Sequence, residues 1–379
     1  MISLRRTVLI VGMVHLVLAV VVSYKFNWHI SGLIRINFSS AQMRQELMSP
    51  DLVVLTQSTG FDGKEHYFVA VDPFPGPGYP TPYRLKRILY PLASHIIACG
   101  KREWLPAAMF IVNLLAVLAG TLFIGKTLQC AGRPPVWAII YGLSIGEIVG
   151  LKYSLTSPLA LGLAAGGMYF WHRNRAIASA VFFSLSLLSN EYTLVIPVIL
   201  ALNGFFLEKQ RVRAMILAAS PLPWIAYVFF ITRLYTQRAV TDAGAIFAPP
   251  LQGIIDIIHH LNVTPPWRHF FYNDVAPLIF AGIVAMIVIS QILRLKNGIA
   301  PYPLLVLYYI AFALFLKEDC WRIINISRYL SAVFPLMIMG AMTNPNRIEK
   351  ILAAGSILFS LLAIIGVLVE PRVPFILWH

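Results

Sequence analysis

The chain has 379 residues, of which 58% are hydrophobic and only 12% are charged, and its mean hydropathy is +0.74. A soluble domain carries roughly twice that fraction of charged residues, so the composition excludes an ordinary soluble protein. The formal net charge of +14 is explained by the side of a membrane on which basic residues gather, and it does not require a nucleic-acid partner.

Apolar runs of about 16–22 residues recur along the chain, which is close to the length a helix needs to cross the bilayer hydrocarbon. The first follows Arg5 and Arg6 and has no small-residue cleavage site, which predicts a retained signal-anchor helix. We predict an all-α integral membrane protein with one polytopic domain over 1–379. Eleven transmembrane helices are predicted, at 5–24, 105–125, 134–151, 155–171, 176–190, 192–207, 213–231, 275–293, 301–316, 329–343 and 350–368.

The basic residues predict the orientation of these spans. If the N-terminus lies inside, every predicted cytoplasmic link carries at least two Lys or Arg, as the positive-inside rule expects. Of the acidic residues, only Glu208 and Glu349 then fall on the cytoplasmic side. The C-terminus is predicted outside, and the long external loops are 25–104, 232–274 and 317–328.

The first external loop, 25–104, is the most polar long segment. A Pro-Gly-rich stretch at 73–78 divides it. Before that stretch, residues 39–48 predict a short helix with a serine cap. After it, residues 84–99 predict a second helix with one apolar stripe, which would lie along the membrane surface.

Two carboxylates in this loop are candidates for chemistry. Asp62, between Phe61 and Gly63, could act as a general base that takes a proton from an attacking hydroxyl. Asp-Gly is also a common turn sequence, and this alternative stays open. Asp72 could be a second acid at the same site or a ligand for a divalent cation, or it could only initiate a turn before Pro73.

Basic residues supply candidates for binding an anion. Arg84, Lys86 and Arg87 form the densest external basic cluster and could clamp a lipid phosphate, because the forked donors of arginine suit that group. The alternative is a solvated helix face. Arg322 and Arg328, near the ninth span, could bind phosphate or pyrophosphate, or belong to a local network of salt bridges.

Ionisable residues also stand at the external ends of the third to sixth spans. They are Glu147, Lys152 and Glu191. Ionisable side chains at such positions more often face a protein cavity than lipid, which predicts a cavity-facing environment for these three. A simple helix cap is the alternative for Glu191. The cysteines and histidines fit no metal-binding spacing. We predict no metal and no cofactor, although a divalent cation is left open.

One string in the first loop resembles a known family. Gly60-Phe61-Asp62-Gly63, with Tyr67, Ala70 and Asp72-Pro73, then Tyr83-Arg84 and Arg87-Ile88-Leu89-Tyr90-Pro91, looks like a prokaryotic branch of the GT-C superfamily of membrane glycosyltransferases. That branch is distantly similar to the GPI-anchor mannosyltransferases of the PIG-M and PIG-V type. The layout of a long external loop after the first span, followed by about ten further spans, agrees with this resemblance.

The resemblance implies transfer of a hexose or mannose-like sugar from a polyprenyl-phosphate donor to a lipid-linked or cell-envelope glycan acceptor. It implies that Asp62 is the catalytic base and that Tyr67 and Asp72, within the matched string, lie at the substrate. The Asp-x-Asp of some relatives is absent, because Gly63 and Lys64 follow Asp62. The short loops favour a bacterial inner membrane with the site facing the periplasm. The alternatives are a transporter or flippase of lipid-linked intermediates, and a non-catalytic scaffold for envelope assembly.

Overall fold

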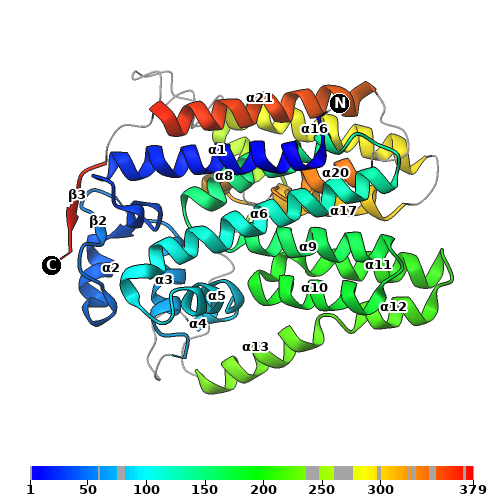
Figure 1. The fold of residues 1–379 in the computed structure, drawn as a ribbon. Coiled ribbons are helices and arrows are strands. Elements are labelled where there is room, and N and C mark those ends of the chain that lie inside the picture. Colours follow the sequence, from blue (N-terminus) through cyan, green and yellow to red (C-terminus); the bar gives the residue numbers. More distant parts are fainter. Residues whose placement is uncertain are drawn as a thin grey trace.

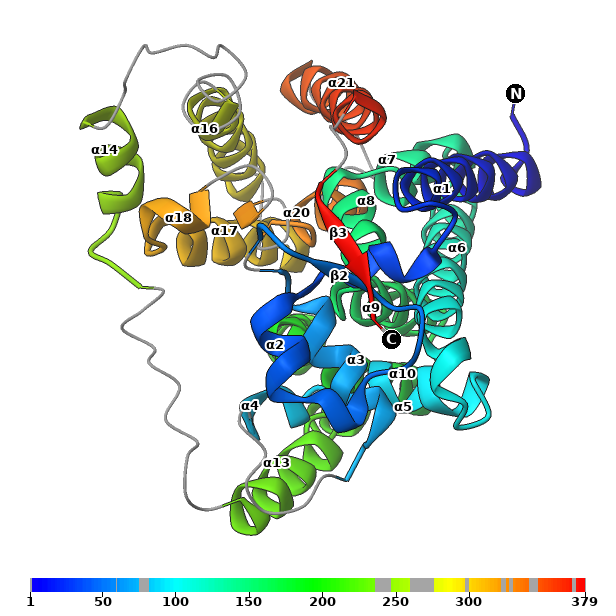
Figure 2. The same cartoon turned by 90° about the vertical axis from the view of Figure 1, so that its left-hand side faces the viewer.

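The structure, a computed structural model, describes residues 2–58, 60–74, 82–235, 247–259, 276–296, 300–321, 325–326, 330–340, 347–369 and 373–378. Helices predominate in these residues, and most of the long ones run side by side (Figure 1). The smaller elements of the first loop gather at one end of this bundle, where they face the viewer in Figure 2.

Helices occupy all eleven segments that the sequence predicts as spans. In chain order they are α1 (Leu4–Lys25), α6 (Leu105–Cys130), α7 (Ile139–Gly142) with α8 (Ile145–Lys152), α9 (Ser157–His172), α10 (Ala176–Ser189), α11 (Val195–Phe206), α12 (Arg211–Ala218) with α13 (Leu222–Leu234), α16 (Ala276–Leu295), α17 (Pro301–Leu314), α20 (Val333–Gly340) and α21 (Arg347–Val369).

Within the described residues, three helices are long and apolar enough to cross a membrane: Leu4–Lys25, Arg102–Cys130 and Arg211–Leu234. The pair Pro135–Gly142 and Ile145–Lys152, bent by 47°, would make a fourth. The protein is therefore mostly helical, with a few helices suited to a membrane, and the count of eleven crossings stays a prediction. Helix length explains the difference, since the 16 residues of α9 rise only about 24 Å against a hydrocarbon core of about 30 Å.

Small residues allow α9 to pack closely between α6 and α10. A Cβ atom added at Gly162 would lie 2.3 Å from the carbonyl oxygen of Ala116 on α6, so only glycine fits there. The neighbouring α9 residues Ala160, Ala164 and Ala165 are buried as well. Close approach of helix backbones through small residues is typical of helix pairs in membranes, so the composition of α9 explains its central place.

A small sheet departs from the predicted all-α class. It orders β1 (Ile36–Asn37), β2 (Val53–Leu55) and β3 (Phe375–Leu377), with β1–β2 parallel and β2–β3 antiparallel. Strands this short have no periodic sequence signal, and β3 lies at the far end of the chain. The pairing places the C-terminal segment beside the first loop.

The first loop forms several short helices around this sheet. They are η1 (Ile30–Leu33), α2 (Phe38–Met43), η2 (Gln45–Leu47), α3 (Gly63–Val71), α4 (Pro82–Leu85), α5 (Leu89–Ile97) and η3 (Arg102–Trp104). The single helix predicted over 84–99 is wrong, because a turn that carries Lys86 and Arg87 separates α4 from α5. Further along the chain lie η4 (Pro135–Ala138), η5 (Glu191–Leu194), α14 (Gln252–His259) and α18 (Glu318–Trp321).

A buried asparagine ties the loop to the bundle. The Nδ2 atom of Asn113 on α6 donates to the carbonyl oxygen of Leu155 at 2.9 Å and to the hydroxyl of Tyr90 on α5 at 3.1 Å. The Tyr90 hydroxyl in turn donates to the carbonyl oxygen of Met109 at 3.2 Å. Buried polar groups that are hydrogen-bonded in this way fix the relative positions of the elements that carry them.

Candidate functional site

Asp62 lies at the N-terminus of α3, where its carboxylate is paired with an arginine. The side chain makes no capping hydrogen bond to the helix. Instead, Nη2 of Arg84, at the end of α4, donates to Oδ1 of Asp62 at 2.7 Å. The exposed fractions are 26% for Asp62 and 12% for Arg84, so the pair sits at the edge of the interior. The backbone still turns at Asp62, but its carboxylate is not needed for that turn.

Gly63 allows this placement of Asp62. A Cβ atom there would lie 2.3 Å from the carbonyl oxygen of Tyr153 and 2.9 Å from that of Ile34. Both obstacles are backbone atoms, which cannot rotate away. The start of α3 thus packs directly against the backbone at Tyr153 and at Ile34, and this contact fixes the position of Asp62.

The variant Gly63→Ala is expected to be destabilised by about 1–3 kcal/mol, because overpacking forces a backbone shift of this order of cost. It is also expected to lose the Asp62–Arg84 contact through the movement of α3. Thermal unfolding in detergent measures the first effect. The variant Gly282→Ala on α16 makes the same change where a Cβ atom would meet nothing within 4 Å, and it is the matched control. Equal stability of Gly63→Ala and wild type would contradict the close approach.

A second ion pair joins the loop to a distant segment. Arg87 donates from Nε to Oε2 of Glu191 at 2.9 Å and from Nη2 to Oε1 at 2.7 Å, although 104 positions separate the two residues. Glu191 opens η5 after Asn190, whose side chain accepts from the backbone N–H of Tyr192. Burial alone would raise the pKa of Glu191, but the charge and hydrogen bonds of Arg87 outweigh it and lower that pKa. The capping role left open for Glu191 therefore belongs to Asn190.

Two lysines add positive charge around these pairs. Nζ of Lys64 donates to Oδ1 of Asn37 at 2.7 Å. Burial lowers the pKa of Lys64, which also interacts electrostatically with Asp62 and Arg84. Lys86 lies in the turn between α4 and α5, where its charge acts on Glu191. We call Asp62, Lys64, Arg84, Lys86, Arg87 and Glu191 the charged cluster.

Sequence reasoning did not assign Lys64 to the site. Its position directly after Asp62-Gly63 is the only signal that could have found it, because a helix starting at Gly63 keeps residue 64 near residue 62. A further pair, at 2.8 Å, joins Glu65 on the same helix to Arg44 at the end of α2 and is more deeply buried, with exposed fractions of 12% for Glu65 and 8% for Arg44. The Arg44 guanidinium also stacks over Phe68 at 4.5 Å, so this pair serves the packing of α3.

Other predicted site residues do not gather at the charged cluster. Tyr67 is fully buried in the apolar core below α3, where burial raises the pKa of its hydroxyl. Asp72 follows the last residue of α3, and the nine residues of that helix separate it from Asp62 by about 13 Å. Asp72 acts electrostatically on Tyr235 instead. Arg322 and Arg328 lie outside the described residues.

Glu147 is buried in the first turn of α8, after the bend between α7 and α8. It is 1% exposed, and no hydrogen bond of normal geometry reaches either carboxylate oxygen from the described residues. The hydroxyls of Tyr141 and Tyr192 are among its electrostatic neighbours. The cavity-facing environment predicted for Glu147 is thus a packed interior.

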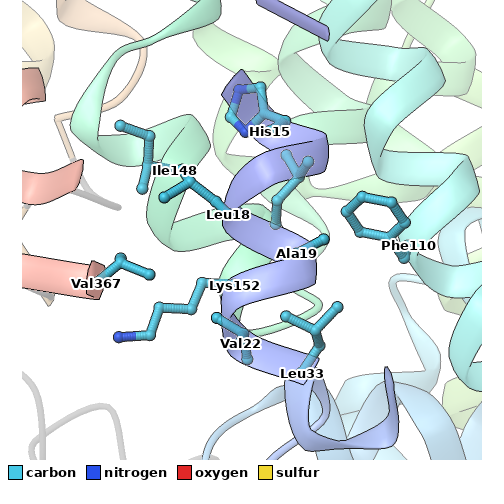
Figure 3. A pocket seen from close by; sticks show the side chains of 10 residues that line it. His15, Leu18, Ala19, Val22, Leu33, Phe110, Ile148, Lys152 and Val367 are labelled. Carbon is cyan, nitrogen blue, oxygen red and sulfur yellow. The ribbon is translucent and has the colours of Figure 1, made fainter. Parts of the chain in front are cut away.

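An apolar crevice of about 260 Å³, counting space open to solvent, lies between α1, α6, α8 and α21. Leu18, Val22, Phe110 and Val367 are among its lining residues, and the side chain of Lys152 extends along it (Figure 3). It does not include any residue of the charged cluster. Within the described part of the chain, no three His, Cys, Asp or Glu side chains are grouped so that they could hold a metal ion.

No family model matches this chain, and no curated protein and no solved structure matches it either. The geometry of the charged cluster is therefore the basis for a functional assignment.

Proposed function

We propose that this protein is a membrane glycosyltransferase that moves a sugar from a polyprenyl-phosphate donor to a lipid-linked or cell-envelope glycan acceptor. The observation that carries the proposal is the charged cluster, in which Arg84 donates to Asp62 and Arg87, three positions further along the chain, donates to Glu191. A carboxylate beside arginines combines a proton acceptor with donors for a phosphate. The proposed location is a bacterial inner membrane with eleven spans and the cluster on the periplasmic face.

The reaction needs a proton acceptor for the attacking hydroxyl and positive charge at the leaving phosphate. The acceptor hydroxyl oxygen forms a bond to the anomeric carbon of the sugar while the bond from that carbon to the phosphate oxygen breaks. The electron pair of the broken bond leaves with the polyprenyl phosphate, and the hydroxyl proton goes to Asp62. Arg84 and Arg87, with Lys64 and Lys86 nearby, stabilise the charge that develops on the departing phosphate.

A transfer assay tests the proposal. The purified protein in lipid nanodiscs is given a panel of polyprenyl-phosphate hexoses and a lipid extract as acceptor, and release of polyprenyl phosphate is measured by mass spectrometry. We expect release with at least one donor that depends on the acceptor. Absence of release with every donor, from protein with an unchanged melting temperature, would overturn the proposal and favour a scaffold.

One observation favours transport as a second candidate. The helix pair α7–α8 is bent by 47°, and Glu147 is buried directly after the bend. Transporters often bind ions or substrates at broken helices, and ionisable groups within a membrane often mark a transport path. In this reading Glu147, and not Asp62, carries the function.

The variant Glu147→Gln separates the two candidates. The transferase proposal predicts that it keeps transfer activity and that its stability falls by less than about 1 kcal/mol or rises, because a neutral amide keeps the shape of the side chain and needs no counter-charge in a buried position. Thermal unfolding and the transfer assay measure the two quantities. Transport that is lost in Glu147→Gln and retained in Asp62→Asn would support the second candidate instead.

A further inference from the structure

Both arginines of the charged cluster already hold a carboxylate where a phosphate would bind. Arg84 donates to Asp62 at 2.7 Å, and Arg87 makes two hydrogen bonds to Glu191. The forked donors of a guanidinium suit carboxylate and phosphate oxygens equally well. A phosphate that enters the cluster therefore competes with the protein's own side chains.

The two pairs differ in how readily they can be exchanged. Arg87 holds Glu191 by two hydrogen bonds, whereas the structure shows one between Arg84 and Asp62. Neither Asp62 nor Glu191 caps its helix, and the side chain of Asp62 is 26% exposed against 36% for Glu191. An incoming anion therefore breaks one hydrogen bond to displace Asp62 from Arg84, and two to displace Glu191 from Arg87.

The charge of the cluster favours an anionic ligand. Lys64, Arg84, Lys86 and Arg87 are basic, and the acidic members of the cluster are Asp62 and Glu191. The cluster therefore keeps a surplus of two positive charges, which suffices for the single negative charge of a sugar phosphodiester donor and for the dianion of the phosphate monoester that leaves. Displacement of Asp62 from Arg84 would also free the carboxylate oxygen that accepts from Arg84 and make the carboxylate more basic.

We propose that the phosphate of an anionic ligand displaces Asp62 from Arg84, so that the Asp62 carboxylate is released as a proton acceptor only when that ligand is bound. This inference rests on the proposed function for the identity of the ligand as the sugar donor. In this proposal Asp62 interacts first with Arg84 and then, after the donor has bound, with the acceptor hydroxyl. The donor is therefore predicted to bind before the acceptor is activated. No covalent bond changes in the exchange, since one ion pair replaces another.

Phosphate binding to Asp62→Asn tests the exchange. The variant is expected to bind inorganic phosphate about tenfold more tightly than wild type, because removing a competing charged hydrogen bond is worth about 1.5 kcal/mol or more. Calorimetric titration of protein in nanodiscs of neutral lipid gives the dissociation constants. Asp62→Ser repeats the measurement with a second side chain. Binding by both variants that is equal to or weaker than that of wild type would overturn the proposal.

Two control variants make the result specific. Asp51→Asn removes the same charge from the same loop, at an exposed position with a left-handed backbone that asparagine tolerates, and is expected to bind phosphate as wild type does. Arg84→Ala is expected to bind more weakly than wild type. If Asp51→Asn also binds phosphate more tightly than wild type, the effect comes from the net charge of the loop, and the exchange is contradicted.

A lipid probe distinguishes the source of the phosphate. Dodecyl phosphate is expected to bind more tightly than inorganic phosphate to wild type and to Asp62→Asn, and equal affinities would contradict a lipid-borne donor. The two proposals can fail separately. If wild type shows no transfer but Asp62→Asn binds phosphate more tightly than wild type, the proposed function is wrong and the exchange of ion pairs stands. If wild type transfers sugar but neither Asp62 variant binds phosphate more tightly, the exchange is wrong and the proposed function stands.

Discussion

Replacement of Asp62 by asparagine is expected to reduce the rate of sugar transfer by about 100- to 10,000-fold, the range that a general base contributes. Asparagine keeps the shape of the side chain and can still accept a hydrogen bond from Arg84, so the melting temperature is expected to change little. An amide cannot take the proton of the acceptor hydroxyl. The loss should therefore appear in the rate at saturating substrate rather than in donor binding.

The measurement is the rate of polyprenyl-phosphate release by wild type and variant at equal protein concentration. Asp51→Asn serves as the matched control, because it makes the same chemical change at an exposed position of the same loop. It is expected to retain wild-type activity. Full activity of Asp62→Asn would remove Asp62 as the base, whatever the effect on phosphate binding.

The ion pair between Arg87 and Glu191 is expected to give the second large effect. Each of the single variants Arg87→Ala and Glu191→Ala is expected to lose stability, and together they should show a coupling energy of about 1–3 kcal/mol, as hydrogen-bonded ion pairs in contact do. Two parallel hydrogen bonds make this pair stronger than an ordinary surface pair. Transfer should also fall in Arg87→Ala, because the phosphate loses a donor.

The pH dependence of this coupling follows from the lowered pKa of Glu191. A carboxylate whose pKa is lower in the folded protein stabilises the fold above its ordinary pKa and loses that contribution as the pH falls through the lowered value. The double-mutant cycle should therefore give its full coupling at pH 7 and a smaller one in acid. Coupling below about 0.3 kcal/mol at pH 7 would contradict the contact, because that is the scatter of independent sites.

Several features of the fold follow from local sequence. Apolar runs predict the positions of the helices well, because helix formation in apolar surroundings depends on the composition of one continuous segment. Before the Pro-Gly stretch the sequence predicts one helix, at 39–48, where the structure has α2 and η2, and the helix α3 is missed. The turn at Lys86 and Arg87 is missed, since its flanking residues have helical periodicity and nothing in the sequence marks the break. The small sheet is missed because its last strand comes from the opposite end of the chain.

The candidate site could be predicted only in part. The residue types in the first loop identify Asp62 and the basic residues Arg84 and Arg87. The structure pairs Arg84 with Asp62 and Arg87 with Glu191. The resemblance to a known family implied that Asp72 and Tyr67 belong with them. In the structure, Asp72 instead lies at the opposite end of α3 from Asp62, and the side chain of Tyr67 is buried in the core.

The sequence by itself determines that this chain is mostly helical, with apolar helices suited to a membrane, and that its first long loop concentrates carboxylates and basic residues. These are properties of composition over continuous segments. Only the tertiary structure decides which charged side chains are in contact. Arg87 pairs with Glu191, which is 104 positions away in the sequence, and Arg84 pairs with Asp62, which is 22 positions away. The physical reason is that an ion pair forms where packed helices bring two side chains within about 3 Å, and that distance depends on the whole fold.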